Sequence, residues 1–174
     1  MRIDKRLILK YCERYDLESK GTPDELMEKE LAEWFNEHKY LDRNHLIELG
    51  RWKSPRALKQ YKDKINSDER VKEITSFSLS SKDEYVRIVC PQILKGVSWG
   101  VASVILHFAY PDDYTILDFR AVWSLGWEEP KQYSFDYWMD YINLVRKVTE
   151  ECGVTLRQLD KALWQYSKEN QINK

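Results

Sequence analysis

The chain has 174 residues and balanced charge, with 28 basic and 29 acidic side chains. This length favours one compact domain, and 43% hydrophobic residues exclude a disordered chain. The charge balance also excludes a protein that is basic all over, so a surface for a polyanion has to be local. With 6 glycines and 5 prolines the chain has too few turn residues for an all-β sandwich or barrel. We therefore predict an all-α fold, a single-domain orthogonal helical bundle over residues 1–174.

The first residues, Met1-Arg-Ile-Asp-Lys-Arg-Leu, lack the apolar segment of a secretory signal. The longest nearly uncharged apolar run, 99–109, has 11 residues, whereas a membrane-spanning helix needs about 20. Cys12, Cys90 and Cys152 are far apart and follow no CxxC spacing. We predict a cytoplasmic monomer with reduced cysteines, no membrane segment, no metal and no cofactor.

Two helix starts in the first half of the chain use the same residue types. Thr22 and Pro23 place a cap residue before a proline and two acids, which is typical of a helix beginning. Ser54-Pro55 repeats the combination, and we expect the helix after it to bury Leu58, Tyr61 and Ile65 on one side.

The rest of the chain is also mainly helical in pattern. Residues 75–80 alternate weakly and are the only strand candidate, while 82–93 return to helical spacing. Apolar residues recur at helical spacing over 135–152, where Gly153 closes the segment, and again after Thr155, a cap residue. The pattern predicts eight to ten short helices.

The stretch Leu94-Lys-Gly-Val-Ser-Trp-Gly100 connects two predicted helices. Gly96 and Gly100 permit positive φ and close backbone approach, so the N–H groups that open the second helix can point at a phosphate. A glycine-bracketed corner is also compatible with packing alone. We predict a helix-hairpin-helix at about 84–110.

Asp118 lies eighteen residues beyond Gly100, after a short loop and before a further predicted helix. An acid at this point either caps that helix or carries chemistry. Arg120 either contacts a phosphate or pairs with Asp118 or Asp113.

Together, the hairpin and the acid resemble the helix-hairpin-helix (HhH-GPD) DNA glycosylase superfamily. Its members share L-P-G-V-G-x-x-x-A and, further on, an aspartate in V-D-x-H-V-x-R. The matching residues are Leu94, Gly96, Val97, Ala102 and Asp118. The resemblance covers about 85–126, and it implies an all-helical fold, duplex DNA as partner and base excision. Trp52-Lys-Ser-Pro-Arg is similar to an uncharacterised bacterial branch of this superfamily, as is the segment that begins at Leu159.

Several departures from the superfamily pattern affect the implied chemistry. Lys95 replaces the hairpin proline, Ser98 its second glycine, Arg120 the usual His or Asn, and Trp123 the usual Arg. Gly100 stands where bifunctional members carry a Schiff-base lysine. The resemblance therefore implies a monofunctional N-glycosylase, in which Asp118 stabilises the oxocarbenium-like sugar and orients the attacking water.

Residues 51–64, which we call the basic segment, carry six bases and one acid. Their local charge of +5 leaves −6 on the rest of the chain, so they are the electrostatic indication of a polyanion partner. An ordinary solvated helix face would have the same spacing. Trp52 either stacks on an extruded base or packs inward.

The leading hypothesis is a DNA-binding protein of base-excision type. Its DNA-backbone residues would be Lys95, Gly96, Val97, Ser98, Gly100, Arg51, Lys53 and Arg56. Trp52, Trp99 and Trp123 are candidates for a base pocket, and Arg120 would support a catalytic Asp118. The alternatives are a noncatalytic nucleic-acid binder on the same fold, and a structural or partner-binding helical protein.

Overall fold

The computed structural model describes residues 3–171, which form ten α-helices, two short 3-10 helices and no strand. The prediction of an all-α fold with eight to ten helices is confirmed. The helices make two compact units: unit 1 is residues 1–20 with 111–174, and unit 2 is residues 21–110. Each unit is described by itself below, and the single domain over 1–174 stays a prediction.

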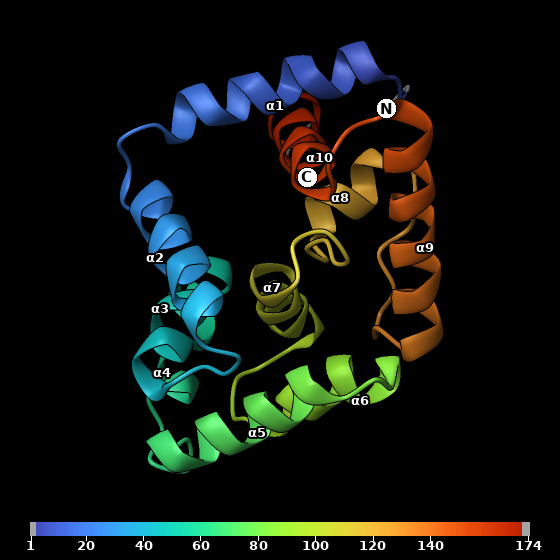
Figure 1. Cartoon of the computed structure of the whole chain (residues 1–174). Coiled ribbons are helices and arrows are strands. Elements are labelled where there is room, and N and C mark those ends of the chain that lie inside the picture. The colour runs from blue at the N-terminus through green and yellow to red at the C-terminus, as the bar shows by residue number, and fades with distance from the viewer. Residues whose placement is uncertain (1–2, 172–174) are drawn as a thin grey trace. The chain divides into compact units, whose positions relative to one another are not determined.

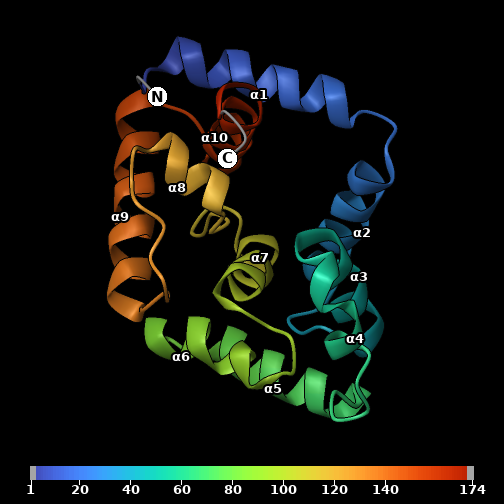
Figure 2. The same ribbon diagram turned by 180° about the vertical axis from the view of Figure 1, so that it is seen from behind.

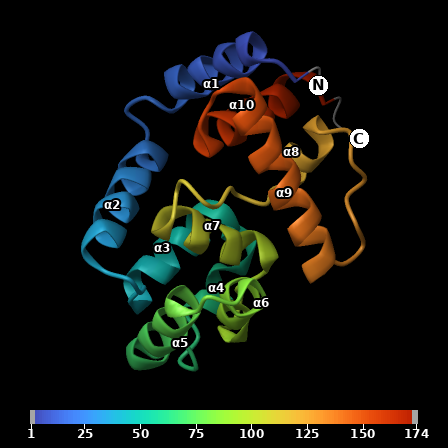
Figure 3. The same cartoon turned by 45° about the vertical axis from the view of Figure 1, so that its right-hand side comes forward.

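Unit 2 is built around one apolar helix, α7. Its elements are α2 (Pro23–Glu37), α3 (Arg43–Lys53), η1 (Pro55–Ala57), α4 (Leu58–Tyr61), α5 (Asp68–Ser80), α6 (Glu84–Val89), η2 (Cys90–Ile93) and α7 (Trp99–Ala109). Helix α7 contacts α2, α3, α6 and η2 (Figures 2 and 3). Residues 101–107 are all buried, because this helix has no polar face to leave in water. The run predicted as a buried helix is therefore confirmed.

Helix starts in unit 2 are fixed by side-chain caps. The hydroxyl of Thr22 accepts from Glu25 N, with Pro23 at the first helical position. Asp42 accepts from His45 N at 2.8 Å at the start of α3, and Ser67 accepts from Arg70 N at 3.2 Å at the start of α5. Each cap satisfies one of the amides that a helix start leaves without an intrahelical partner.

Unit 1 joins the beginning of the chain to its last third. Its elements are α1 (Lys5–Ser19), α8 (Phe119–Ser124), α9 (Phe135–Cys152) and α10 (Leu156–Asn170). Helix α1 crosses α10 (Figure 1), and α10 also contacts α8 and α9. Gly153 ends α9 in the left-handed conformation, and Thr155 forms a capping box with Gln158, so both predicted helices here are confirmed.

Two predictions about local structure are wrong. Residues 75–80 are not a strand but the last turns of α5, where Val71, Thr75, Ser78 and Leu79 form one buried helical face. The helix expected after Ser54-Pro55 ends already at Tyr61, and Ser54 makes no side-chain cap. Ile65 lies in the following turn and is 54% exposed, because the chain has left the helix before reaching it.

Candidate nucleic-acid interface

A tight turn connects η2 to α7 in unit 2. We call residues 94–100 the hairpin. Leu94 is buried, and its carbonyl accepts from Val97 N at 3.1 Å. Gly96 has φ +93°, and Ser98 caps α7 with its hydroxyl, which accepts from Val101 N. The N–H groups at the first two positions of α7 have no intrahelical acceptor, as at any helix start. The turn therefore presents a surface of the kind that binds anions.

One tyrosine ring connects this turn to the basic segment. Tyr61 is fully buried, and a Cβ built at Gly96 would lie 2.9 Å from its ring. A Cβ built at Gly50, in α3, would lie 2.5 Å from the same ring. Both positions need glycine because the ring occupies the space between them. The structure thus places the hairpin beside residues 50–61, a contact that the sequence does not reveal.

The basic segment is not one helix but a succession of short pieces: the end of α3, η1, α4 and a turn. Arg51 pairs with Glu48 at 2.9 Å, while Arg56, Lys59, Lys62 and Lys64 are exposed and Lys53 is half-buried. The one acid of the segment, Asp63, pairs with Lys95 of the hairpin. The predicted DNA-backbone residues of the hairpin and of the basic segment thus share one region of unit 2.

The tryptophans proposed for a base pocket have different surroundings. Trp52 is half-buried and meets Phe108 of α7 edge to face, with ring centroids 6.3 Å apart. This contact favours the inward-packing alternative for Trp52. Trp99 opens α7 and is also half-buried, next to the hairpin. Trp123 lies in unit 1, on α8.

Asp118 is the N-cap of α8 in unit 1, and its Oδ1 accepts from Arg120 N at 2.9 Å. The buried segment 114–117 leads to it. Tyr141 donates its hydroxyl to Ile116 O at 2.9 Å, which holds that segment against α9. The structure therefore confirms that Asp118 caps α8, which is one of the two alternatives that the sequence leaves open. Its side chain is only partly exposed, and a catalytic role stays a prediction.

Arg120 and Trp123 lie against aromatic side chains of α10. The Arg120 guanidinium sits over the Trp164 ring, 5.4 Å from its centroid, and over Phe119 at 5.2 Å. Trp123 stacks on Tyr166, with centroids 6.0 Å apart, and remains 37% exposed. The predicted supporting residue is thus positioned by cation–π contacts.

Two tyrosines near Asp118 escaped the sequence analysis. Burial raises the pKa of Tyr141 well above its ordinary range, and the charges of Asp160 and Asp118 add to this effect. Burial also raises the pKa of Tyr133, with further contributions from Glu129, Tyr137 and Asp118. The helical periodicity of α9 gave a signal for Tyr141 as a core residue, but none for its closeness to Asp118.

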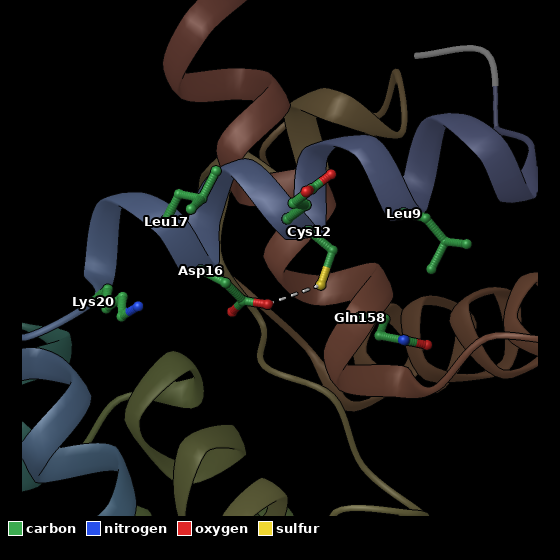
Figure 4. A pocket seen from close by; sticks show the side chains of 7 residues that line it. Leu9, Cys12, Asp16, Leu17, Lys20 and Gln158 are labelled. Carbon is green, nitrogen blue, oxygen red and sulfur yellow. Dashed lines mark hydrogen bonds between the residues drawn. The ribbon is translucent and has the colours of Figure 1, made fainter.

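A shallow pocket of about 350 Å³ lies in unit 1 along α1 (Figure 4). Its lining residues are Leu9, Cys12, Glu13, Asp16, Leu17, Lys20 and Gln158. The thiol of Cys12 points at Asp16, with Sγ 3.7 Å from Oδ2. Burial, aided by Asp16, raises the pKa of Cys12 to about 11, so the thiol is protonated at neutral pH. None of the predicted site residues lines this pocket.

Residues 3–171 contain no cluster of metal ligands and no helix that could span a membrane. In that range no three side chains of His, Cys, Asp or Glu gather as a metal ion would require. The described helices include none with both the length and the apolar character to cross a bilayer.

The all-helical fold is similar to that of a DNA glycosylase, as comparison with a solved structure shows. The chain is similar to the 8-oxoguanine glycosylase/lyase of Methanocaldococcus jannaschii, solved in complex with a 15mer DNA containing 8-oxoguanine. The TM-score is 0.53 at 17% identity, and the match covers 99% of this chain and 85% of the other. No family model and no curated protein matches the sequence.

Proposed function

We propose that this protein binds duplex DNA and removes a damaged or modified base as a monofunctional N-glycosylase. The observation that carries the proposal is the packing of Tyr61, a residue of the basic segment, against Gly96 of the hairpin and Gly50 of α3, which brings the basic segment and the hairpin side by side. The glycosylase fold and the DNA in the similar structure support the same class of partner. A cytoplasmic monomer and a bacterial branch of the superfamily stay predictions from the sequence.

The DNA backbone would be bound in two ways on this surface. Backbone N–H groups of residues 96 and 98–100 would donate to phosphate oxygens, as helix starts do. The N–H groups of Lys95 and Val97 are already bonded to Asn66 Oδ1 and Leu94 O. Arg51, Lys53 and Arg56 would contribute charge, which favours any duplex and is weakened by salt. Lys95 would also contribute charge, since its ammonium group stands in the hairpin itself.

Asp118 would carry the chemistry. As the bond between the base and C1′ breaks, the base leaves with the bonding electrons and positive charge develops on the sugar. The Asp118 carboxylate would stabilise this charge and accept a proton from the water that attacks C1′. The departing base takes up this proton, so that the products are the free base and an abasic site and the carboxylate is regenerated. Gly100 stands at the position of the Schiff-base lysine, so we expect no lyase step there.

The test is base excision on a panel of modified duplexes, beginning with 8-oxoguanine. The pure protein should create alkali-labile sites in at least one duplex, and Asp118→Asn should abolish them. Asparagine caps helices as well as aspartate does, so this variant should keep the fold and the affinity. Asp140→Asn, at an exposed acid of α9, is the control and should retain activity. Product formation that survives Asp118→Asn removes Asp118 from the catalytic role.

Two further measurements separate the alternatives. Affinity for a duplex should fall with salt with a slope on the order of three to five, and a flat response would contradict DNA binding. Salt-dependent binding without any excision would favour the noncatalytic binder. Borohydride should trap no adduct between protein and DNA; a trapped adduct would show that another lysine acts as nucleophile.

A further inference from the structure

A single buried asparagine holds the hairpin backbone. Asn66 lies in the turn between α4 and α5 and is fully buried. Its Oδ1 accepts from Lys95 N at 2.9 Å, and its Nδ2 donates to Lys95 O at 3.0 Å. The same amide nitrogen lies 3.2 Å from Tyr61 O and 3.3 Å from Gln60 O. One side chain therefore links both backbone groups of a hairpin residue to two carbonyls of the basic segment, with the two hydrogens of its NH2 group shared among three carbonyl oxygens.

The turn that carries Asn66 is itself fastened to α3. Arg43, the first residue of α3, donates from Nε to Asn66 O at 2.9 Å and from Nη2 to Lys62 O at 2.7 Å. Its backbone N donates to Asp68 at the start of α5. The backbone carbonyl of Asn66 is thus bonded to Arg43 of α3, while its side chain is bonded to the backbone of Lys95 in the hairpin.

These contacts make the hairpin a preformed element. A loop that orders only when it binds loses affinity to the entropy of ordering, and amide donors tolerate little error in direction. A buried carboxamide with both its oxygen and its nitrogen bonded has one stable orientation. It therefore fixes where the following N–H groups point.

We propose that Asn66 is a positioning residue for DNA binding. It fixes the backbone N–H groups of residues 96 and 98–100 relative to the basic side chains of residues 51–64, so that both sets of groups reach one phosphate backbone. The inference rests on the proposed function. Asn66 itself would contact no DNA, since its side chain is buried.

The matched variants are Asn66→Ala and Thr75→Val. Thr75 is also fully buried in unit 2, where its hydroxyl accepts from Leu41 N at 2.9 Å and donates to Val71 O at 2.7 Å. Both substitutions remove buried hydrogen bonds and lower stability, but only one touches the hairpin. Binding is measured at a temperature at which urea titration shows every variant to be folded. Asn66→Ser, which keeps a small polar side chain, replaces Asn66→Ala if that variant does not fold.

We expect Asn66→Ala to weaken duplex binding about ten-fold and to lower the salt slope by about one, as when a phosphate contact is lost. Thr75→Val should leave affinity within about two-fold and the slope unchanged. Amide hydrogen exchange on the full chain supplies a readout without DNA: residues 95–100 should exchange faster in Asn66→Ala and not in Thr75→Val.

The outcomes distinguish this inference from the proposed function. If the wild-type protein shows no salt-dependent binding, the proposed function fails and the positioning role fails with it. If the wild type binds and folded Asn66→Ala binds with the same affinity and slope, only the positioning role is overturned. Equal losses of affinity in Asn66→Ala and Thr75→Val would also overturn it, because the effect would then follow stability alone.

Discussion

Asp63 opposes the charge of the surface on which it lies. It is the one acid among the bases of the basic segment, and its carboxylate pairs with the ammonium of Lys95 in the hairpin. The hydrogen bond from Lys95 lowers the pKa of Asp63, so the acid stays ionised at neutral pH. A phosphate that approached Lys95 would have to compete with this carboxylate.

Asp63→Asn should therefore strengthen DNA binding. Removing one negative charge beside the hairpin should raise duplex affinity about three-fold at low salt and steepen the salt slope by up to about one. Fluorescence anisotropy with a labelled duplex measures both. Glu73→Gln, at an exposed acid of α5 in the same unit, is the charge-matched control and should have a smaller effect. Weaker binding by Asp63→Asn would mean that the ion pair orders Lys95 for DNA rather than competing with it.

Gly96 meets two requirements at once, a positive φ and the absence of a Cβ against Tyr61. Gly96→Ala should lower the free energy of unfolding by about 2 kcal/mol. Gly21→Ala separates the two causes, since Gly21 has φ +72° but nothing within 4 Å of an added Cβ. This control should cost only about 1 kcal/mol. Urea denaturation measures both, and equal losses would show that the Tyr61 ring moves aside freely.

At the residue scale, the sequence indicates candidate site residues but not their spatial neighbours. The hairpin residues and Asp118 were proposed because they follow a motif within a short stretch, and their roles stay predictions. Tyr61 was predicted only as a helix-face residue and Asn66 not at all. Each contacts the hairpin across about thirty residues of chain, and no local periodicity encodes such a contact.

Among the elements, α1 and α10 form a pair, with three ionic contacts from the last turns of α1. Asp16 pairs with Lys161 at 2.6 Å, Arg14 with Glu169 at 2.9 Å, and Glu18 with Lys168. The hydrogen bond from Lys168 lowers the pKa of Glu18 below its ordinary value of 4.5. A lowered pKa in the folded state means that ionised Glu18 stabilises the fold.

The pH dependence of this contribution has a definite sign. It is fully present above the pKa of glutamate in the unfolded chain and is lost as the pH falls through the lowered folded value. Glu18→Gln should thus be less stable than wild type by about 0.5 kcal/mol at pH 7, as is usual for exposed ion pairs. The two should converge below pH 4. Glu13→Gln, at an exposed acid of the same helix, is the control and should have the stability of the wild type at pH 7. Urea titrations across this pH range test it, and a constant difference would contradict the assignment.

Helices with strong caps were predictable, and short or weakly amphipathic ones were not. The bounds of α7 and α9 follow from composition and period, and Thr22 and Thr155 mark true helix starts. The strand at 75–80 was wrong because alternating apolar residues there also satisfy the spacing of α5. The cap that would have shown this, Ser67, stands eight residues earlier. Helix α4 is only 4 residues long, too short for a period to appear.

For the molecule as a whole, the candidate DNA-binding residues and the candidate catalytic residue belong to different units. The hairpin and the basic segment belong to unit 2, and Asp118 belongs to unit 1. Unit 2 is also continuous in sequence, from residue 21 to residue 110, and has its own buried helix, α7.

A fragment of residues 21–110 should therefore fold and bind a duplex with most of the salt slope of the full chain, yet excise no base. Circular dichroism would measure the folding of the fragment, and fluorescence anisotropy would measure its binding to a duplex. Thr75→Val in the fragment would show whether the unit still unfolds cooperatively. An unfolded fragment would indicate that the two units depend on each other, which would support the predicted single domain.

The pairing of α1 with α10 has a consequence for biosynthesis. The ribosome makes α1 early and its partner late, and at about 5–20 residues per second the two are separated by on the order of ten seconds. During that interval the face of α1 that packs on α10 is exposed, including Tyr11, whose ring lies against Tyr166 in the folded protein. Unit 2 emerges complete in the meantime. The nascent chain should thus pass through a state in which unit 2 is folded while the apolar face of α1 is still exposed. Such an exposed face is a target for chaperones.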